Sequence, residues 1–338
     1  MTKIVKPCTV VAPTRRQFVE GAAALGAATA FGTFPAFAQD KYPSRDVHVI
    51  AAFPAGSGAD VFTRYFAENM KPFLGGNIIV ENKVGASGNL ALNHVARSKP
   101  DGYTILIHAP SSIAAAPSLF KDPGFDPEKA FDVLGSVCRL PFTISVSSKS
   151  PHKNMADLIA AVKAKGAKAS YGTTAPTGQV AGAMMKNILK LEIIEVPYRT
   201  AADSVNDLDS GAIDYIMYDP IFALPRHRDG RARVLAITTK ERMTTAPDIP
   251  TMHESGIPGV DVYGWWGAAV PKGVPEPVKE KIAAAFRQMA ELPATKKWLA
   301  DFGGDPWVVG PAEAQKQMLE DIKNWASFVR IANLEPKG

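Results

Sequence analysis

The chain has 338 residues, of which 46% are apolar and 21% are charged, and its formal net charge is +5. Four basic residues and one acidic residue fall within residues 1–38, so three of the five net charges lie there and about two remain for the rest. This near balance excludes the clustered basic surface of a nucleic-acid-binding protein, and we expect no nucleic-acid partner.

The first feature along the chain is an export signal. Arg15-Arg16 precede an uncharged run from Gly21 to Phe37 that is too short and too weakly apolar for a permanent membrane span. Ala36-Phe37-Ala38 then places small residues where a signal peptidase cuts. This order predicts a twin-arginine signal peptide over residues 1–38, cleavage after Ala38 and a soluble periplasmic protein. The alternative is a poorly ordered N-terminal extension that contains Arg-Arg by chance.

Short β-rich runs alternate with helical patterns from residue 47 onward, which is typical of α/β proteins with parallel sheets covered by helices. The first group has strands at Val47–Phe53, Asn77–Asn82 and Tyr103–Ala109, with a helix over Asp60–Phe73 that carries an apolar stripe. We expect these elements to form one lobe.

A second group begins at Phe142–Ser148, and a third follows the loop Thr244–Gly259. The remaining strands are expected at Ala169–Gly172, Ile193–Tyr198, Ile213–Tyr218, Val234–Thr239 and Val262–Val270, and the helices at Met155–Lys165, Gly178–Leu191, Ala201–Ser210, Glu276–Leu292, Ala294–Phe302 and Pro311–Leu334.

A chain that leaves one lobe, builds another and returns makes two crossovers, which predicts a hinge and a cleft. We therefore predict lobe 1 from residues 41–141 with 262–338, and lobe 2 from residues 142–261. The alternative is one large doubly wound sheet. Packing must stabilise either arrangement, because Cys138 is the only cysteine after the signal and no internal disulfide can form.

The loop from Phe53 to Asp60 is the most informative candidate site, because it joins a predicted strand to a predicted helix. Gly56 and Gly58 permit close approach of a ligand to the backbone, and the helix N-terminus favours an anion. Neither a dinucleotide-binding fingerprint nor a P-loop is present. A carboxylate is the simplest ligand, and a plain helix-capping turn is the alternative.

Further small or polar clusters follow other predicted strands, where α/β proteins place their ligands. Each alone is typical of a turn. Because they come from both lobes, we expect two facing amide clusters that could clamp an anionic ligand. The clusters are Gly85–Gly88, Ala109–Ser112, Thr173–Gly178, Tyr198–Thr200 and Tyr218–Pro220.

The sequence lacks the patterns of catalysis and metal binding. Its six histidines are scattered without metal-ligand spacing, and no G-x-S-x-G or C-x-x-C-H motif occurs. We therefore expect no catalytic residue, no metal site and no cofactor. Of the adjacent Trp265 and Trp266, at least one should be in the core, because neighbouring strand residues face opposite ways. Arg199 could pair with a carboxylate or lie on a lobe rim.

The chain resembles the tripartite tricarboxylate transporter substrate-binding proteins, also called the Bug family, over nearly all of its length after the signal. The motifs that carry the resemblance are Tyr42-Pro43, Val47–Asp60 with Arg64, Glu81–Asn89, Pro100–Thr104, Val196–Arg199, Leu208 with Gly211 and Asp214, and Ala246–Thr251 with Glu254 and Gly256.

The resemblance implies a periplasmic, type II, Venus-flytrap binding protein that closes over a small carboxylate and serves a tripartite tricarboxylate transporter in the membrane. With the loop analysis, it predicts these ligand-binding residues: Ala55, Gly56, Ser57, Gly58, Asp60, Ala86, Ser87, Ser111, Ser112, Thr173, Thr174, Thr177, Gly178, Tyr198, Arg199 and Asp219.

The chain departs from the family pattern in one stretch. Ala175 and Thr177 replace loop glycines, Ala181-Gly182 replace His-Leu, and Met184 replaces an acidic residue. Fewer polar groups on that wall predict a less polar carboxylate, such as an aromatic one, in place of a simple polar dicarboxylate.

Two other hypotheses keep the same fold. One is a ligand-sensing partner of a membrane signalling protein, which genomic neighbours would distinguish. The other is an extracytoplasmic hydrolase or lyase, which would need a base within hydrogen-bond reach of Ser57 or Ser111. We expect a monomeric binding protein and no enzyme.

The export signal makes a direct prediction. N-terminal sequencing of the periplasmic protein should begin at Gln39. Replacing Arg15 and Arg16 with lysine keeps the charge and should leave the precursor in the cytoplasm, because the twin-arginine route reads the arginine pair. Unchanged export of that variant on cell fractionation would refute the assignment.

Overall fold

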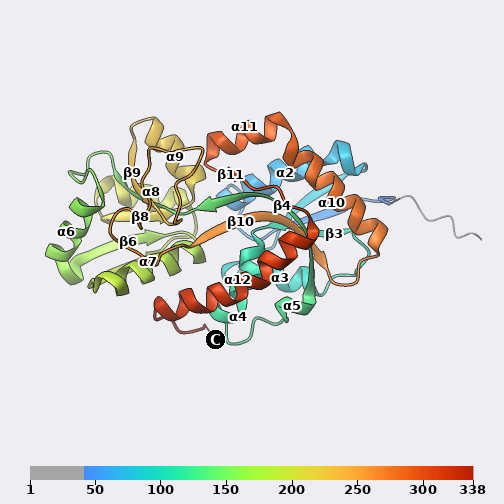
Figure 1. Cartoon of the computed structure of the whole chain (residues 1–338), viewed down its shortest axis with the longest axis horizontal. Helices are drawn as coiled ribbons and strands as arrows, with labels where there is room; N and C mark the ends of the chain where they lie inside the picture. The colour runs from blue at the N-terminus through green and yellow to red at the C-terminus, as the bar shows by residue number, and fades with distance from the viewer. Residues whose placement is uncertain (1–41, 338) are drawn as a thin grey trace, which may run out of the picture. The chain divides into compact units, whose positions relative to one another are not determined.

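The computed structural model describes residues 42–337, which contain two separate β-sheets (Figure 1). The predicted twin-arginine signal and the predicted cleavage after Ala38 lie outside the described residues. The order of the six-stranded sheet is β11 (Asp305–Pro306), β4 (Phe131–Pro141), β10 (Tyr263–Pro271), β3 (Thr104–His108), β1 (Val47–Ala51) and β2 (Ile78–Asn82). The order of the five-stranded sheet is β7 (Ile193–Pro197), β6 (Ala169–Thr173), β8 (Tyr215–Tyr218), β5 (Thr143–Ser147) and β9 (Ala232–Ile237).

Both sheets are mixed in direction. Strand β1 is parallel to β2 and β3, and β6 is parallel to β7 and β8. Strand β10 is antiparallel to β3 and β4, and β5 is antiparallel to β8 and β9. The expectation of parallel sheets is therefore correct only for three strands of each sheet. The expected alternative, one large doubly wound sheet, is wrong.

Helices follow most strands. The helices that accompany the first sheet are α2 (Gly58–Leu74), α3 (Asn89–Ala96), α4 (Pro110–Leu119), α5 (Pro127–Ala130), α10 (Glu276–Glu291), α11 (Pro293–Phe302) and α12 (Pro311–Ile331). Those that follow strands of the second sheet are α6 (Met155–Lys165), α7 (Pro176–Leu189), α8 (Ala201–Ser210) and α9 (Pro220–Arg228). Short 3₁₀ turns, η1 (Ala86–Gly88) and η2 (Gly166–Lys168), complete the set. Within the described residues, no helix is both long enough and apolar enough to cross a membrane.

The amphipathic patterns explain the helices that the sequence predicts. Helix α2 begins after Ser57, whose hydroxyl accepts a hydrogen bond from the amide of Asp60, and it buries Phe62, Phe66 and Met70. The sequence prediction missed strands β4 and β11 and helices α3, α4, α5 and α9. Helices α4 and α9 begin with proline at their first position, which also reads as a turn signal.

The chain crosses between the sheets at two places. Strand β4 ends at Pro141 and β5 begins at Thr143, so the first crossover consists of one residue, Phe142. The second follows β9 and leads to β10. The strands before Pro141 and after Tyr263 build the first sheet, and those between build the second.

Thr238 connects the two crossovers. Its hydroxyl accepts a hydrogen bond from the amide of Phe142 at 2.8 Å and donates one to the carbonyl of Val262 at 2.5 Å. Its own amide donates to the carbonyl of Phe142 at 3.0 Å, and its carbonyl accepts from the amide of Val262 at 3.1 Å. All three residues are buried. One side chain therefore holds both connecting segments in register.

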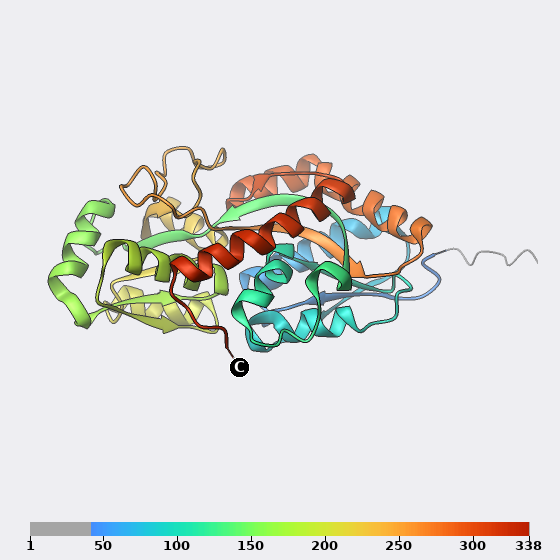
Figure 2. The ribbon, with the colours of Figure 1, turned by 60° about the horizontal axis from the view of Figure 1, so that its bottom comes forward.

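Helix α12 also connects the two halves. Its first turns pack beside the first sheet, where Ala314 and Met318 join a cluster with Trp265. Its last turns place Trp325 and Val329 in the core of the second sheet. In Figure 2 the red α12 runs from β4 and β10 to α7. The assignment of all of residues 262–338 to lobe 1 stays a prediction.

The Thr238 contacts predict a large loss of stability in an isosteric variant. Thr238→Val keeps the volume but leaves the buried amide of Phe142 and carbonyl of Val262 with fewer partners. We expect the free energy of unfolding to fall by about 2–4 kcal/mol. Urea denaturation measures this change.

Thr239→Val is the matched control, because the Thr239 hydroxyl contacts only the nearby carbonyl of Glu241 in an exposed loop. Its unfolding free energy should change by less than about 1 kcal/mol. Equal losses in the two variants would show that the crossovers do not depend on Thr238.

Candidate functional site

The loop between β1 and α2 forms one wall of a cavity. Ser57 caps α2, and Gly58 and Ala59 are the first helical residues, so their amides have no acceptor within the helix. Ser57, Gly58 and Ala59 all line the cavity. The positive end of the α2 dipole adds to these free donors. This wall favours an anion.

Asp60 stabilises the same loop from behind. Its carboxylate accepts hydrogen bonds from the amide of Gly56 at 2.9 Å, from Nε of Arg64 at 2.9 Å and from Nδ2 of Asn82 at 2.8 Å. Burial alone would raise the pKa of Asp60, but these hydrogen bonds outweigh it and lower the pKa. The amide of Gly56 is thus committed to Asp60.

The segment after β2 approaches the cavity in an unusual backbone conformation. Gly85, Ala86, Ser87 and Gly88 have φ values of 151°, 45°, 52° and 93°. Positive φ is unfavourable for alanine and serine, so surrounding contacts must compensate for this strain. Ser87 lines the cavity and Gly88 packs near Phe53.

The second sheet contributes three helix N-termini. Helix α7 brings Ala175, Pro176 and Thr177, helix α8 follows Arg199 and Thr200, and helix α9 follows Asp219. Thr174 also lines the cavity, and its buried hydroxyl has no partner among the described residues. Arg199 is exposed at the edge.

Helix N-termini from both sheets therefore converge on one cavity. The cavity and the solvent-open space at its mouth together amount to about 930 Å³. Orphan amides, helix dipoles and one guanidinium converge there, which suits an anionic ligand. Its lining from the first sheet and its helices includes Ser57, Gly58, Ala59, Ser87, Asn89, His108, Ala109 and Ser112, and that from the second includes Thr174, Ala175, Pro176, Thr177, Arg199, Thr200, Ala201 and Asp219.

The rest of the lining is strongly apolar. Phe142 enters it from the first crossover, Phe222 from α9 and Trp266 from β10. Trp265 points to the other face, where it is buried and its indole N–H donates to Asp321 at 2.7 Å. One tryptophan is thus a core residue and the other a cavity residue. Further apolar lining comes from Phe53, Leu92, Ala115, Leu119, Phe120, Leu140 and Trp325.

His108 is a buried polar group in this apolar wall. It ends β3 next to the rings of Phe53 and Trp266, and its Nε2 lies 3.2 Å from the hydroxyl of Ser112. Its Nδ1 is buried without a partner in the described part of the chain. Burial lowers the pKa of His108 to about 4, so the imidazole is neutral at pH 7. His108 thus contributes hydrogen-bonding capacity without charge.

The cavity brings half of the sequence-predicted site residues together. The eight that line it are Ser57, Gly58, Ser87, Ser112, Thr174, Thr177, Arg199 and Asp219. Seven others lie outside the lining: Ala55, Gly56, Asp60, Ala86, Thr173, Gly178 and Tyr198. The side chain of Ser111 lies outside the described part, so its role stays a prediction.

Several of the residues outside the lining have other partners. The hydroxyl of Thr173 donates to Glu195 at 2.7 Å, and that of Tyr198 donates to Asp207 at 2.5 Å. Gly178 allows close packing, because a Cβ there would lie 2.9 Å from the ring of Phe142. These residues support the loops next to the cavity.

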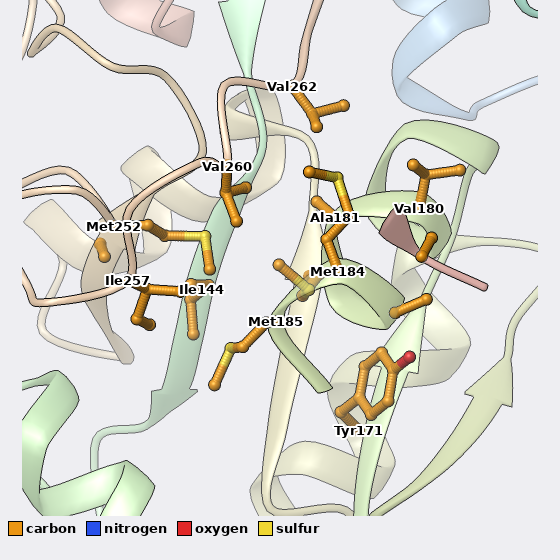
Figure 3. Packing of buried hydrophobic residues seen from close by; sticks show 14 of the residues in the cluster. Ile144, Tyr171, Val180, Ala181, Met184, Met185, Met252, Ile257, Val260 and Val262 are labelled. Carbon is orange, nitrogen blue, oxygen red and sulfur yellow. The ribbon is translucent and has the colours of Figure 1, made fainter. Parts of the chain in front are cut away.

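Of the residues that depart from the family pattern, Ala175 and Thr177 line the cavity, whereas Ala181, Gly182 and Met184 do not. Ala181 and Met184 are buried in the core of the second sheet, with Tyr171 and Ile144 nearby (Figure 3). A Cβ on Gly182 would lie 2.4 Å from the Tyr171 ring. Ala181, Gly182 and Met184 therefore give no support to the prediction of a less polar ligand, because they pack in the core of the second sheet, and the prediction itself stays untested.

Sequence reasoning missed most of the apolar lining and His108. Their positions in the sequence could have indicated them, because Phe53, His108 and Phe142 each lie within two residues of the end of a strand. At those positions only polar residues and glycines were expected to contact a ligand. Among residues 42–337, no cluster of His, Cys, Asp or Glu could hold a metal ion.

Comparisons with known proteins show which family has this fold and this sequence. A family model described as "Tripartite tricarboxylate transporter family receptor" matches residues 62–334. A UPF0065 protein from the TAR-I ttuE-ttuC' intergenic region of Agrobacterium vitis is 30% identical over 300 residues, covering 87% of this chain and 86% of that protein. BugT of Bordetella pertussis is 27% identical, covering 86% of this chain and 90% of BugT.

Solved structures match over a similar length. The periplasmic binding protein BugD is 31% identical with a TM-score of 0.81, covering 88% of this chain and all of that one. An R. palustris protein with adipate is 27% identical with a TM-score of 0.79, covering 87% and 99%. MatC from Rhodopseudomonas palustris with bound malate is 26% identical with a TM-score of 0.77, covering 85% and 100%.

The buried His108 predicts a pH-dependent component of stability. Its pKa in the folded chain, about 4, lies below the unfolded value of 6.5, so the unfolded chain binds more protons between these values. The stability from neutral His108 is complete above pH 6.5 and is lost as pH falls towards 4, by about 3 kcal/mol.

The measurement compares urea unfolding of the wild type and His108→Gln at pH 7 and pH 4. The loss on acidification should be smaller in the variant by about 3 kcal/mol. Equal losses in the two proteins would show that His108 accepts a proton in the folded state as easily as in the unfolded state.

Proposed function

Because the chain belongs to the tripartite tricarboxylate transporter receptor family, we propose that it is a periplasmic solute-binding protein. In this proposal it captures a small carboxylate between its two lobes. It then delivers the carboxylate to the membrane subunits of a tripartite tricarboxylate-type transporter. The family and its solved relatives are receptors and binding proteins, and the chain is a receptor rather than an enzyme. The convergence of helix N-termini from both sheets on one cavity carries this proposal.

Carboxylate as the ligand class has two kinds of support. The related proteins from R. palustris were solved with malate and adipate, which are both carboxylates. In this chain, the amides of Gly58, Ala59 and Thr177 lie at helix N-termini that line the cavity, with Arg199 at its edge. Together they could hold one carboxylate group from both sides.

The apolar lining refines the ligand class. Phe142, Phe222 and Trp266 offer ring surfaces where a highly charged tricarboxylate would find few partners. The ligand that fits best has a carboxylate head and an apolar or aromatic body. The ring-lined wall supports this ligand class, whereas the buried residues Ala181–Met184 do not.

The two lobes are already in contact at the cavity. A Cβ on Gly58, at the start of α2, would lie 2.8 Å from Cγ2 of Ile221 and 3.1 Å from Cε2 of Phe222, both on α9. The absence of a side chain at Gly58 lets α2 approach α9 this closely. We propose that this contact forms when the lobes close over the ligand.

Isothermal titration calorimetry tests both parts of the proposal. The probes are succinate, adipate, citrate, benzoate and 3-phenylpropionate. The wild type should bind at least one of them, with the phenyl compounds above citrate. Gly58→Ala should weaken that binding about tenfold, because its methyl group opposes lobe contact at a cost of about 1–3 kcal/mol.

Gly310→Ala is the matched control, since a Cβ there meets no atom within 4 Å and Gly310 lies outside the cavity. Its affinities should match the wild type. A folded wild type that binds none of the carboxylates would refute the proposed function. Unchanged affinity in Gly58→Ala would refute only the role of the α2–α9 contact.

A further inference from the structure

Asp219 is an acidic group in a cavity that otherwise favours anions. It follows β8 directly and occupies the N-cap position of α9, yet its side chain makes no capping hydrogen bond. Its carboxyl group lines the cavity. Its Oδ2 lies 3.6 Å from the position that a Cβ on Gly58 would occupy, so it faces the free amide end of α2 from the opposite lobe.

The basic groups of the same helix are occupied elsewhere. Arg226 pairs with Asp209 at 2.8 Å, and Arg228 donates to the carbonyls of Ala300 and Asp301 on α11. Within residues 42–337, no ion pair involves Asp219. Of the other titratable groups that line the cavity, His108 is neutral and Arg199 is exposed at its edge.

An unpartnered carboxylate at this position has consequences for the ligand. Burial raises the pKa of Asp219 to about 6, which still leaves it mostly ionised at pH 7. A ligand carboxylate placed against it would be repelled, whereas a hydroxyl or ammonium group would satisfy it. The donor must lie next to the carboxylate head, because α2, which offers amides to the head, also faces Asp219.

We propose that Asp219 is a specificity-determining residue that accepts a hydrogen bond from a hydroxyl or ammonium group beside the ligand's carboxylate, so that the preferred ligands are 2-hydroxy or 2-amino acids. This inference rests on the proposed carboxylate-binding function and deepens it. Asp219 is half-buried in the free chain. An acceptor that a bound ligand covers and must satisfy rejects the analogue that lacks the donor more strongly than it rejects a change in apolar size.

Matched ligands separate the donor from the rest of the molecule. One series is succinate, malate and aspartate, and the other is 3-phenylpropionate, 3-phenyllactate and phenylalanine. Within each series only the substituent beside the carboxylate changes, from hydrogen to hydroxyl to ammonium. Calorimetry of the whole mature protein at pH 7.5 measures all six dissociation constants.

In the series that binds, we expect the hydroxy or amino member to bind at least about tenfold more tightly than the unsubstituted acid. Asp219→Ala should reduce that ratio to near one, and it should bind the unsubstituted acid at least as tightly as the wild type, because the repulsion is gone. Asp219→Asn keeps the shape and loses the charge, so its preference for the ammonium member over the unsubstituted acid should be smaller than that of the wild type. The unfolding midpoints of Asp219→Asn and Asp219→Ala show whether each variant is folded.

Asp229→Ala is the control at the other end of α9, where Asp229 forms an exposed pair with Arg231. It should keep the wild-type ratios. Equal binding of all members of a series by the wild type, or a preference that persists in Asp219→Ala, would overturn the inference and leave the carboxylate-binding function intact. A folded wild type that binds none of the six would overturn both.

Discussion

The arrangement of the two sheets depends on the hydrogen bonds around Thr238. The chain passes between the sheets twice, and Phe142, Thr238 and Val262 in these passages are buried, so their backbone groups must find partners inside the protein. Thr238 provides these partners to Phe142 and Val262 at once. Since Phe142 also lines the cavity, the same contacts fix the floor against which a ligand would lie. Phe142 therefore belongs both to the connection between the lobes and to the surface that would contact a ligand.

The sequence was sufficient for the fold class and for most elements. Periodicity located α6 and α8 with the bounds that the structure gives, because their apolar stripes and caps agree. It failed at α4 and α9, where proline at the helix start follows a strand directly and resembles a turn. The antiparallel strand β10 was located, but its neighbours in the sheet depend on a return of the chain that no local pattern encodes.

The candidate site was predictable only where a residue type at a given position has one common structural role, such as a helix cap. The Ser57–Gly58 start of α2 and the Thr177 turn indicate orphan amides from sequence alone. Asp60, Thr173 and Tyr198 were equally polar, yet each has a partner nearby, and only three-dimensional packing assigns those partners. The aromatic lining was not predictable in this way, because a phenylalanine at a strand end can face the core or a cavity. The cavity therefore combines helix N-terminal amides, which favour an anionic group, with aromatic walls, which favour an apolar one.

Helix α12 has a consequence for how the molecule gains and loses its structure. Ala314 and Met318 belong to the core of one sheet, and Trp325 and Val329 to the core of the other. Neither core is complete until α12 is in place, so the first sheet cannot finish folding before residues 311–331 have been synthesised. The two lobes should then behave as one cooperative unit, in spite of their separate sheets, and a chain shortened within α12 should lose both.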